Sequence, residues 1–439
     1  MILIKQKGRW GYFLDNIPKK LESALYNKLS YQREGWEFMP NPAWSWVRFY
    51  NRRLRRFPWG LKNKVIGILE QWMKYSGEGY RILDKEFLEH KYFNNIKGLR
   101  PYQVKAVNQL FLHKGGILAM PTGSGKTKTM IEFIKLSGLG KVLVIVHTLD
   151  LKKQWNDELE KEGLKDVCVA TYQSLKKLKP KHELVVFDEC HHVSANTIYK
   201  IAMRCDNAIL VGLSATPYRA YKPETLKIIA ALGEIVYKIS IRELINKKYL
   251  CDAKIKIVEI DRYNEVEYWD TYNDIYTKFI VENEFRNEVI IHKTMQSYKD
   301  GLCLILVDRI DHGRILYSML QSMGNIKSIF IHGQSKKREE IFEDVKKGRY
   351  DIIIASKIYG EGVDIPRLKT LIMAGGGKSS VKIIQQIGRL LRVFPNKGEA
   401  VIYDFKDDVK YLREHFKLRY EIYEKLFEVG MEYWKKENY

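Results

Sequence analysis

The 439-residue chain contains only five cysteines, and they are scattered singly: Cys168, Cys190, Cys205, Cys251 and Cys303. A structural zinc site takes its ligands in closely spaced pairs, such as two cysteines separated by two residues. Even "FDECHH" (187–192), in which Cys190 adjoins two histidines, lacks this spacing. The sequence therefore argues against a zinc site, and its unpaired cysteines are typical of a reducing compartment.

Long hydrophobic runs are also absent. The apolar stretches, such as "VLVIV" and "DIIIA", have the length of strands, whereas a membrane-spanning helix needs roughly 18 apolar residues or more. The N-terminus "MILIKQKGRW" lacks the apolar core and the cleavage site of a secretory signal. We therefore expect a cytoplasmic protein without a membrane segment.

Acidic residues are scarce relative to basic ones, at 53 against 75, which gives a net charge of +22 and a pI near 9.4. This balance favours a polyanionic partner such as nucleic acid, although a lysine-rich thermostable surface is an alternative. Residues 1–100 hold 20 Lys and Arg against 9 Asp and Glu. The same region holds six of the nine tryptophans, Trp10, Trp36, Trp44, Trp46, Trp59 and Trp72. These residues suit phosphate contact and base stacking, or alternatively the core of a small domain.

From residue 115 onward, two series of short apolar runs alternate with helix-like segments. Continuous runs of this kind are typical of parallel strands covered by helices on both faces, so we predict two tandem α/β domains. The expected boundaries are a basic N-terminal domain (1–90), a first α/β domain (91–235), a linker with a short helical insertion (236–290), a second α/β domain (291–410) and a C-terminal helix (411–439).

"MPTGSGKT" (120–127) lies between a predicted strand and a predicted helix, which is the context of a phosphate-binding loop. Gly123 and Gly125 allow backbone N–H groups to close around phosphate oxygens. Lys126 would reach the β and γ phosphates, and Thr127 would ligate Mg²⁺. The strict pattern begins with glycine, whereas this chain has Met120.

"ELVVFDECHH" (183–192) is an apolar strand that ends in two acids. As the partner of a phosphate-binding loop, Asp188 would hold Mg²⁺ and Glu189 would orient and deprotonate the attacking water. His191 is better interpreted as a coupling residue that is hydrogen-bonded toward "SAT" (214–216) than as a metal ligand.

"QQIGRLLR" (385–392) places Arg389 and Arg392 three residues apart, on one face of a predicted helix. Such arginines can neutralise charge on a transferring phosphoryl group, although exposed helix arginines are usually only solvated.

The ordered set of motifs resembles the superfamily 2 helicases. It consists of "LRPYQ" (99–103), "MPTGSGKT", "VHTLDLKKQW" (146–155), "TYQSL" (171–175), "DECHH", "SATPYR" (214–219), "IHG" (331–333), "GEGVDIP" (360–366) and "QQIGRLLR". This resemblance implies two RecA-like parallel-sheet domains that follow a small basic α+β domain, with ATP and Mg²⁺ as cofactors and a nucleic-acid strand crossing both domains.

The resemblance also implies roles for individual residues. Those for ATP are Arg100, Gln103 (which would read the adenine), Thr122, Gly123, Ser124, Gly125, Lys126, Thr127, Gly362 and Asp364. Those for catalysis are Lys126, Asp188, Glu189, Arg389 and Arg392, and those for coupling are His191, Ser214, Thr216 and Gln385. Thr148 and Thr171 would contact DNA.

Within the superfamily, Met120, "DECHH" and the N-terminal region are similar to the XPB and UvsW branch, most of all to archaeal XPB proteins. This similarity implies a 3′ to 5′ DNA helicase or translocase of nucleotide excision repair. It would be nucleoid-associated, a monomer or part of a hetero-complex, and paired with a nuclease. One departure is that Arg219 is followed by Ala220 and Tyr221, where the branch carries two acids.

Two other functions are compatible with these residues. Motifs that track a backbone do not reveal whether a 2′-OH is required, so an RNA helicase is an alternative. A DNA-binding scaffold with weak ATPase activity that recruits a nuclease is another, although the intact Lys126, Asp188, Glu189 and Arg389 argue against it.

Overall fold

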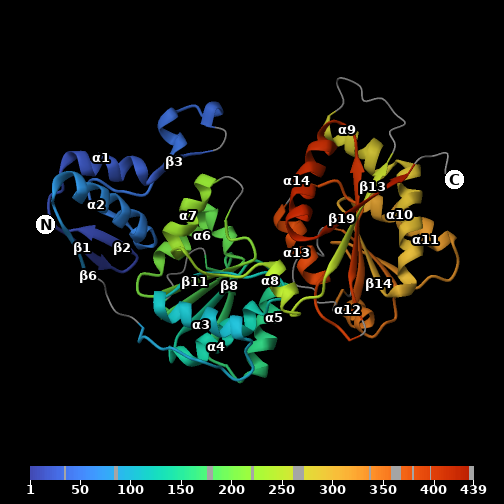
Figure 1. Ribbon diagram of the computed structural model, residues 1–439, viewed down its shortest axis with the longest axis horizontal. Helices are drawn as coiled ribbons and strands as arrows, with labels where there is room; N and C mark the ends of the chain where they lie inside the picture. The colour runs from blue at the N-terminus through green and yellow to red at the C-terminus, as the bar shows by residue number, and fades with distance from the viewer. Residues whose placement is uncertain are drawn as a thin grey trace. The chain divides into compact units, whose positions relative to one another are not determined.

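The computed structural model describes residues 1–33, 36–83, 88–175, 181–218, 222–260, 271–335, 338–356, 367–377, 380–395 and 397–434. The chain divides into two compact units, the first made of residues 1–120 and 125–239 and the second of residues 121–124 and 240–439. Each unit contains a parallel sheet with helices on both faces (Figure 1). In the described part of the chain, no helix is long and apolar enough to cross a membrane.

The first unit begins with a small α+β region. Its four-stranded sheet has the order β5-β2-β1-β6, with β1 (Ile2–Lys7), β2 (Trp10–Phe13), β5 (Arg56–Pro58) and β6 (Tyr80–Leu83). The helices α1 (Lys19–Lys28) and α2 (Lys62–Ser76) pack on it, and β3 (Ser30–Gln32) pairs with β4 (Trp46–Arg48). The core of this region includes Leu226 and Ala230, so it packs directly against the following α/β part.

The α/β part of the first unit has a six-stranded, entirely parallel sheet of order β12-β7-β11-β10-β8-β9. The strands are β7 (Gly116–Ala119), β8 (Val142–Val146), β9 (Val167–Thr171), β10 (Leu184–Asp188), β11 (Ile209–Ser214) and β12 (Ile235–Lys238). The helices are α3 (Pro101–His113), α4 (Lys126–Ser137), α5 (Leu149–Lys161), α6 (Asn196–Arg204) and α7 (Lys222–Leu232). Every residue of β7, β8 and β11 is buried, as expected for strands covered on both faces.

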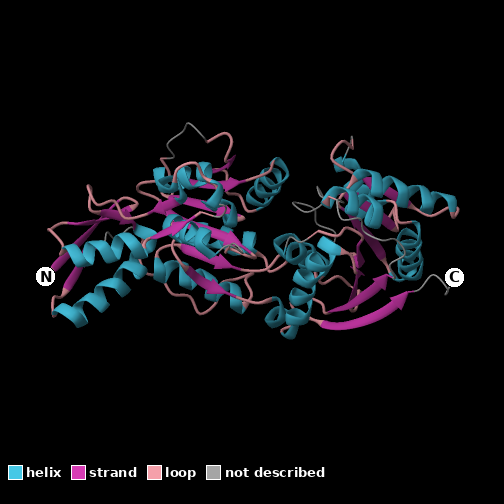
Figure 2. Cartoon of the chain, turned by 90° about the horizontal axis from the view of Figure 1, so that it is seen from above, coloured by secondary structure: helices cyan, strands magenta, loops and turns pink. Residues whose placement is uncertain are grey.

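The second unit has a seven-stranded parallel sheet of order β15-β16-β14-β17-β18-β13-β19. The strands are β13 (Ala253–Ile260), β14 (Leu302–Val307), β15 (Ser328–Ile331), β16 (Ile352–Ser356), β17 (Leu368–Met373), β18 (Ala400–Asp407) and β19 (Glu428–Trp434). The helices are α8 (Ile241–Asn246), α9 (Tyr272–Tyr276), α10 (Glu284–Ser297), α11 (Ile310–Ser322), α12 (Arg338–Lys346), α13 (Ser380–Leu390) and α14 (Lys410–Leu426). Strands and helices alternate along most of this unit. Figure 2 shows the helices lying beside the strands of the sheets.

Two segments contain strands that the sequence did not predict. The range 236–290, expected to be a linker with a helical insertion, includes β13, which pairs with β18 on one side and β19 on the other. The terminal range 411–439, expected to be a helix, contains most of α14 and then β19. The boundaries drawn between the expected domains stay predictions.

Candidate nucleotide site

The predicted phosphate-binding loop connects the end of β7 with the start of α4. Gly123 and Gly125 have φ angles of 83° and 78°, in the left-handed region that favours glycine. A Cβ on Gly125 would also lie 2.4 Å from Nε2 of Gln103. The Nζ of Lys126 donates to the Met120 carbonyl at 3.1 Å, and the Met120 side chain is buried. The apolar residue at the first position of the loop is therefore part of the core.

The loop is supported by hydrogen bonds of its own and by the start of α3. The Ser124 hydroxyl donates to the Pro121 carbonyl at 2.6 Å. Gln103 is buried, and its Oε1 accepts a hydrogen bond from the Arg100 N–H at 2.8 Å, which caps α3. Its Nε2 lies 3.4 Å from the Gly125 carbonyl oxygen. Gln103 thus holds the loop in place, and its expected contact with adenine stays a prediction.

The two acids lie at the carboxyl end of β10, in the middle of the parallel sheet. Asp188 accepts hydrogen bonds on both oxygens, from the indole Nε1 of Trp155 at 2.8 Å and from the Glu189 N–H at 2.9 Å. Glu189 has a left-handed backbone, with φ 48°. This is uncommon for a residue with a side chain and often marks a functional site.

Glu189, His191 and Ser214 form a cluster at the ends of β10 and β11. The Nδ1 of His191 lies 3.2 Å from the Ser214 Oγ and 3.3 Å from the Glu189 Oε2. The Ser214 hydroxyl lies 3.4 Å from the same carboxylate oxygen, and it accepts a hydrogen bond from the Thr216 N–H at 3.1 Å. The hydrogen bond predicted between His191 and the "SAT" segment is therefore present.

The electrostatics of the two acids differ. Burial and the negative charge of Glu189 raise the pKa of Asp188 above its usual range. Burial also acts to raise the pKa of Glu189, but the hydrogen bond with His191 and the positive charge of Lys126 outweigh it and lower that pKa. Glu189 is thus the more readily ionised of the two carboxyls.

These residues fit a divalent cation. Magnesium prefers hard oxygen ligands, and the Thr127 hydroxyl and the Asp188 carboxylate are of that type. The raised pKa of Asp188 results from burial beside a second carboxylate, and a bound cation would offset it.

The remaining residues of "DECHH", Cys190 and His192, pack against neighbouring side chains. The side chain of Cys190 is buried in the hydrophobic core, and burial raises the pKa of its thiol well above the usual value. The ring of His192 lies 4.2 Å from that of His191 and 4.6 Å from that of His147, measured between centroids.

The two threonines expected to contact DNA lie just after or at the carboxyl ends of strands. The Thr148 hydroxyl accepts a hydrogen bond from the Leu151 N–H at 3.2 Å and caps α5. Thr171 is the last residue of β9. Their contact with a strand stays a prediction.

The arginines of "QQIGRLLR" lie at the end of α13 in the second unit. Arg389 is inside the helix, whereas Arg392 lies two residues beyond Leu390, with its N–H donating to the Arg389 carbonyl at 3.3 Å. The expectation that one helical face carries both is therefore corrected, because the helix ends between them. The side chain of Gln385 and the residues Gly362 and Asp364 lie outside the described part, as do residues 219–221.

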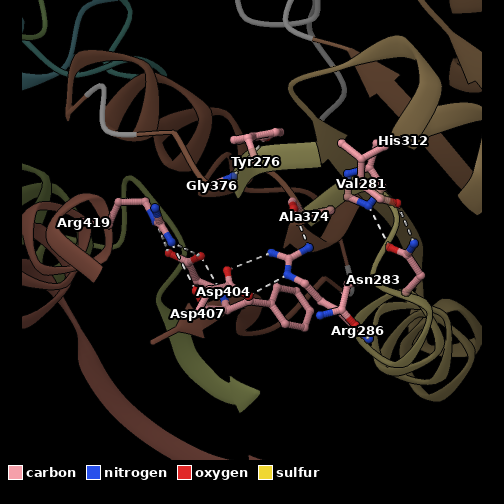
Figure 3. A network of polar contacts seen from close by, with 12 residues as sticks. Tyr276, Val281, Asn283, Arg286, His312, Ala374, Gly376, Asp404, Asp407 and Arg419 are labelled. Carbon is pink, nitrogen blue, oxygen red and sulfur yellow. Dashed lines mark hydrogen bonds and ion pairs between the residues drawn. The ribbon is translucent and has the colours of Figure 1, made fainter. Parts of the chain in front are cut away.

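A buried polar network holds the segment before α13, and the sequence analysis did not predict it (Figure 3). Arg286 donates from Nε to Asp407 at 2.8 Å and from NH1 to the Ala374 carbonyl at 2.8 Å. Arg419 donates from Nε to Asp404 at 2.7 Å and from NH1 to the Gly377 carbonyl at 3.0 Å. Both arginines therefore hold the loop 374–377 between β17 and α13.

Five of the six N-terminal tryptophans fall into two groups, and the sixth, Trp10, is half-buried on β2. Trp59 and Trp72 pack against the hydrophobic core of the α+β region. Trp36, Trp44 and Trp46 are exposed. Core packing therefore holds for Trp59 and Trp72, and base stacking by the exposed tryptophans stays a prediction.

Two family models match this chain. The helicase conserved C-terminal domain matches residues 286–394, and the type III restriction enzyme, res subunit, matches residues 96–167 and 161–219. Together they match just over half of the chain, and the matched ranges include strands of both parallel sheets and both sets of motifs. The chain is a superfamily 2 helicase.

Similar proteins place the helicase in the branch that includes XPB and UvsW. Putative helicase 22 of the Sulfolobus islandicus filamentous virus (isolate Iceland/Hveragerdi) is 29% identical, covering 91% of this chain and 78% of the relative. The DNA 3′-5′ translocase XPB2 of Sulfurisphaera tokodaii is 27% identical, covering 67% and 78%. The ATP-dependent DNA helicase uvsW of Enterobacteria phage T4 is 24% identical, covering 88% of each chain.

Two predictions are confirmed for the helicase. Its fold is that of two RecA-like parallel-sheet domains with an additional N-terminal α+β region. It is a nucleic-acid-dependent ATPase, as helicases are, and therefore binds nucleotide and nucleic acid. One residue of its site that the sequence analysis missed is Trp155, whose only signal is its place in the "VHTLDLKKQW" motif.

Proposed function

We propose that the helicase is an ATP-dependent DNA translocase that remodels or unwinds branched or damaged DNA. The observation that carries this proposal is the cluster of Glu189, His191 and Ser214 at the ends of two adjacent parallel strands. Through this cluster, the acid that acts on ATP contacts the "SAT" segment directly. The choice of DNA is supported by relatives named as a DNA translocase and a DNA helicase.

In this mechanism the phosphate-binding loop holds ATP, with Lys126 on the β and γ phosphates. Thr127 and Asp188 would hold Mg²⁺, whose charge stabilises the transferring phosphoryl group. Glu189 orients the attacking water and accepts its proton. Its lowered pKa keeps the carboxyl ionised, which this role requires, although it also makes the carboxylate a weaker base. His191 positions that carboxylate and relays its state to Ser214 and Thr216.

The second unit would contribute Arg389 and Arg392 to the transferring phosphoryl group. The buried arginines Arg286 and Arg419 support this role, because they hold the loop that leads into α13. Gln385, Gly362 and Asp364 would couple the nucleotide to the strand, which Thr148 and Thr171 contact.

The direction of movement, the pathway and the partner are proposed from the resemblance to the XPB and UvsW branch alone. We propose 3′ to 5′ movement, a place in nucleotide excision repair at the nucleoid and a nuclease as partner. The basic N-terminal region would grip duplex DNA mainly through phosphates, so affinity should fall steeply with salt.

The test is the ATPase rate of the wild type and of Lys126→Ala on single-stranded, duplex, forked and bubble DNA. Loss of the Lys126 ammonium should leave the phosphates poorly held and abolish hydrolysis on every substrate. Matched RNA oligomers test whether the substrate is DNA or RNA. Stronger stimulation of the ATPase rate by RNA than by DNA would contradict the proposal. Tight DNA binding without any hydrolysis by the wild type would instead support a scaffold.

A further inference from the structure

A pocket of about 450 Å³ lies in the first unit, away from the nucleotide-binding loop, where the α+β region meets α6. Three arginines line it, Arg48 on β4, Arg56 on β5, and Arg52 on the turn between these strands. The other lining side chains are aromatic or neutral, and no Asp or Glu is among them. The volume is in the range of ligand pockets, which span roughly 300–1,000 Å³.

Aromatic rings hold the guanidinium groups of these arginines. The Cζ of Arg52 lies 4.0 Å from the ring centroid of Tyr26, and that of Arg56 lies 4.0 Å from the centroid of Trp10. The Cζ of Arg48 lies 5.0 Å from the centroid of the same Tyr26 ring. A guanidinium in contact with a ring in this way loses little further conformational freedom when it binds an anion.

The arginines of this pocket are not paired with a carboxylate within the described residues, although the charge of Glu22 acts on the lining Tyr50. None of the three arginines forms an ion pair with a carboxylate there. Arg56 donates from NH1 to the Tyr12 hydroxyl at 3.1 Å, but its Nε is buried without a hydrogen-bond partner. Guanidinium groups without a carboxylate partner are suited to charge-assisted hydrogen bonds with an anion.

The surroundings favour a nucleic-acid strand over a small anion. Arg48 also lies 5.9 Å from the ring of Trp46, which is 41% exposed. An exposed indole beside a phosphate-binding group is the combination that contacts both the base and the backbone of a strand.

We infer that this pocket, which we call the arginine pocket, binds backbone phosphates of the DNA on which the helicase acts. The inference rests on the proposed function, because it takes DNA as the polymer. Arg52 and Arg56 contact phosphate oxygens inside the pocket, and Arg48 with Trp46 contacts the strand at its edge. Tyr199, on the α6 helix that follows "DECHH", forms part of the wall, so bound DNA lies against the element next to the catalytic acids.

The experiment measures binding of fluorescein-labelled single-stranded and duplex DNA by anisotropy, without nucleotide, over a series of salt concentrations. The Arg48→Ala/Arg52→Ala variant removes two exposed side chains, so the fold should persist, as a thermal unfolding curve would verify. Each lost phosphate contact lowers the slope of log K against log salt by about 0.7 to 0.9. We expect the slope to fall by about one to two and the affinity to fall at least about tenfold.

Two further variants serve as controls. Arg81→Ala removes an exposed arginine from β6, at the opposite edge of the same sheet from β5, and should leave affinity and slope unchanged. Arg52→Lys keeps the charge and should retain most of the slope, while losing affinity because the planar contact with Tyr26 is lost.

The outcomes separate this inference from the proposed function. If the wild type binds no DNA, the proposed function fails. If the wild type binds DNA and the double variant binds equally well with the same slope, only the arginine pocket is refuted. If the double variant loses affinity for inorganic phosphate or for anionic vesicles but not for DNA, the pocket serves another anion and the inference is overturned.

Discussion

His191 connects the acidic segment with the adjacent strand, because its Nδ1 lies 3.2 Å from the Oγ of Ser214 at the end of β11. The same nitrogen lies 3.3 Å from the Glu189 carboxylate. One imidazole ring is thus shared between the proposed catalytic base and the segment that follows β11. A change in the charge or position of Glu189 can therefore alter the hydrogen bond between His191 and Ser214, and the reverse also holds.

Replacing His191 should uncouple hydrolysis from DNA. In His191→Ala we expect the DNA-stimulated kcat to fall about tenfold, equivalent to about 1.4 kcal/mol, while the rate without DNA and the KM for ATP change little. ATPase titrations with DNA measure both rates. His192→Ala is the matched control, because its ring packs beside His191 and His147 and lies further from Glu189 in sequence, and it should keep normal stimulation.

Replacing Glu189 should stop the chemical step but not nucleotide binding. In Glu189→Gln the shape is kept while proton acceptance is lost, so we expect single-turnover hydrolysis to slow by about 10²–10⁴-fold. Binding of a fluorescent ATP analogue should stay near the wild-type value. Lys126→Ala should instead lose both hydrolysis and binding of the analogue, because its ammonium holds the phosphates. Equal loss of binding in both variants would contradict the separate roles.

Removing Arg419 should destabilise the second unit. Arg419 and Asp404 are buried, and Asp404 would be left without its cation, so we expect Arg419→Ala to lower the local free energy of unfolding by about 3–5 kcal/mol. Hydrogen exchange of the β17 and β18 amides measures this free energy. In Arg413→Ala, where the lost partner Asp408 is exposed, the decrease should stay below about 1 kcal/mol.

His312 should make the second unit less stable in acid. Burial and the positive charge of Arg286 lower the pKa of His312 from 6.5 to about 3. Its Nε2 lies 2.9 Å from the Asn287 Oδ1, and its Nδ1 is buried without a hydrogen-bond partner among the described residues. Below about pH 6.5, His312 therefore binds a proton in the unfolded chain but stays neutral in the folded chain. This difference lowers stability by about 1 kcal/mol per pH unit between pH 6 and 5.

The measurement for His312 is hydrogen exchange of the β14 amides at pH 7, 6 and 5, corrected for the intrinsic exchange rate. His312→Leu should be less stable at pH 7 but should show a smaller loss toward pH 5. His292→Leu, in which the histidine on α10 is only partly buried, should keep the wild-type dependence. The same pH dependence in His312→Leu as in the wild type would assign it to other groups.

Much of the nucleotide-binding half of the site could be predicted, because its signals are local in the sequence. The loop around Gly123 and Gly125, the acids at the end of a buried strand and the "SAT" segment each occupy a few consecutive residues. Parallel strands bring their carboxyl ends to one edge of the sheet, so these segments meet without any long-range information. The hydrogen bond between His191 and Ser214 followed from that arrangement.

The buried polar network of the second unit could not be predicted, because it depends on contacts between residues far apart in the chain. Arg286 pairs with Asp407 across 121 positions. In "YLREHFKLRYEIYEKL", Arg419 resembles any charged residue of a surface helix, yet it is only 2% exposed. The strand β19 has a weak apolar pattern because it lies at a sheet edge, and only its pairing with β13 reveals it. The paired roles of Arg389 and Arg392 stay a prediction.

Trp155 gives this protein a built-in optical probe. Its indole N–H donates to Asp188 at 2.8 Å, and the ring is only 1% exposed. Indole emission responds to nearby electric fields, and a cation or a triphosphate arriving at Asp188 would change the field at the ring. With the other eight tryptophans replaced by phenylalanine, each turnover could be followed in real time without attaching a dye.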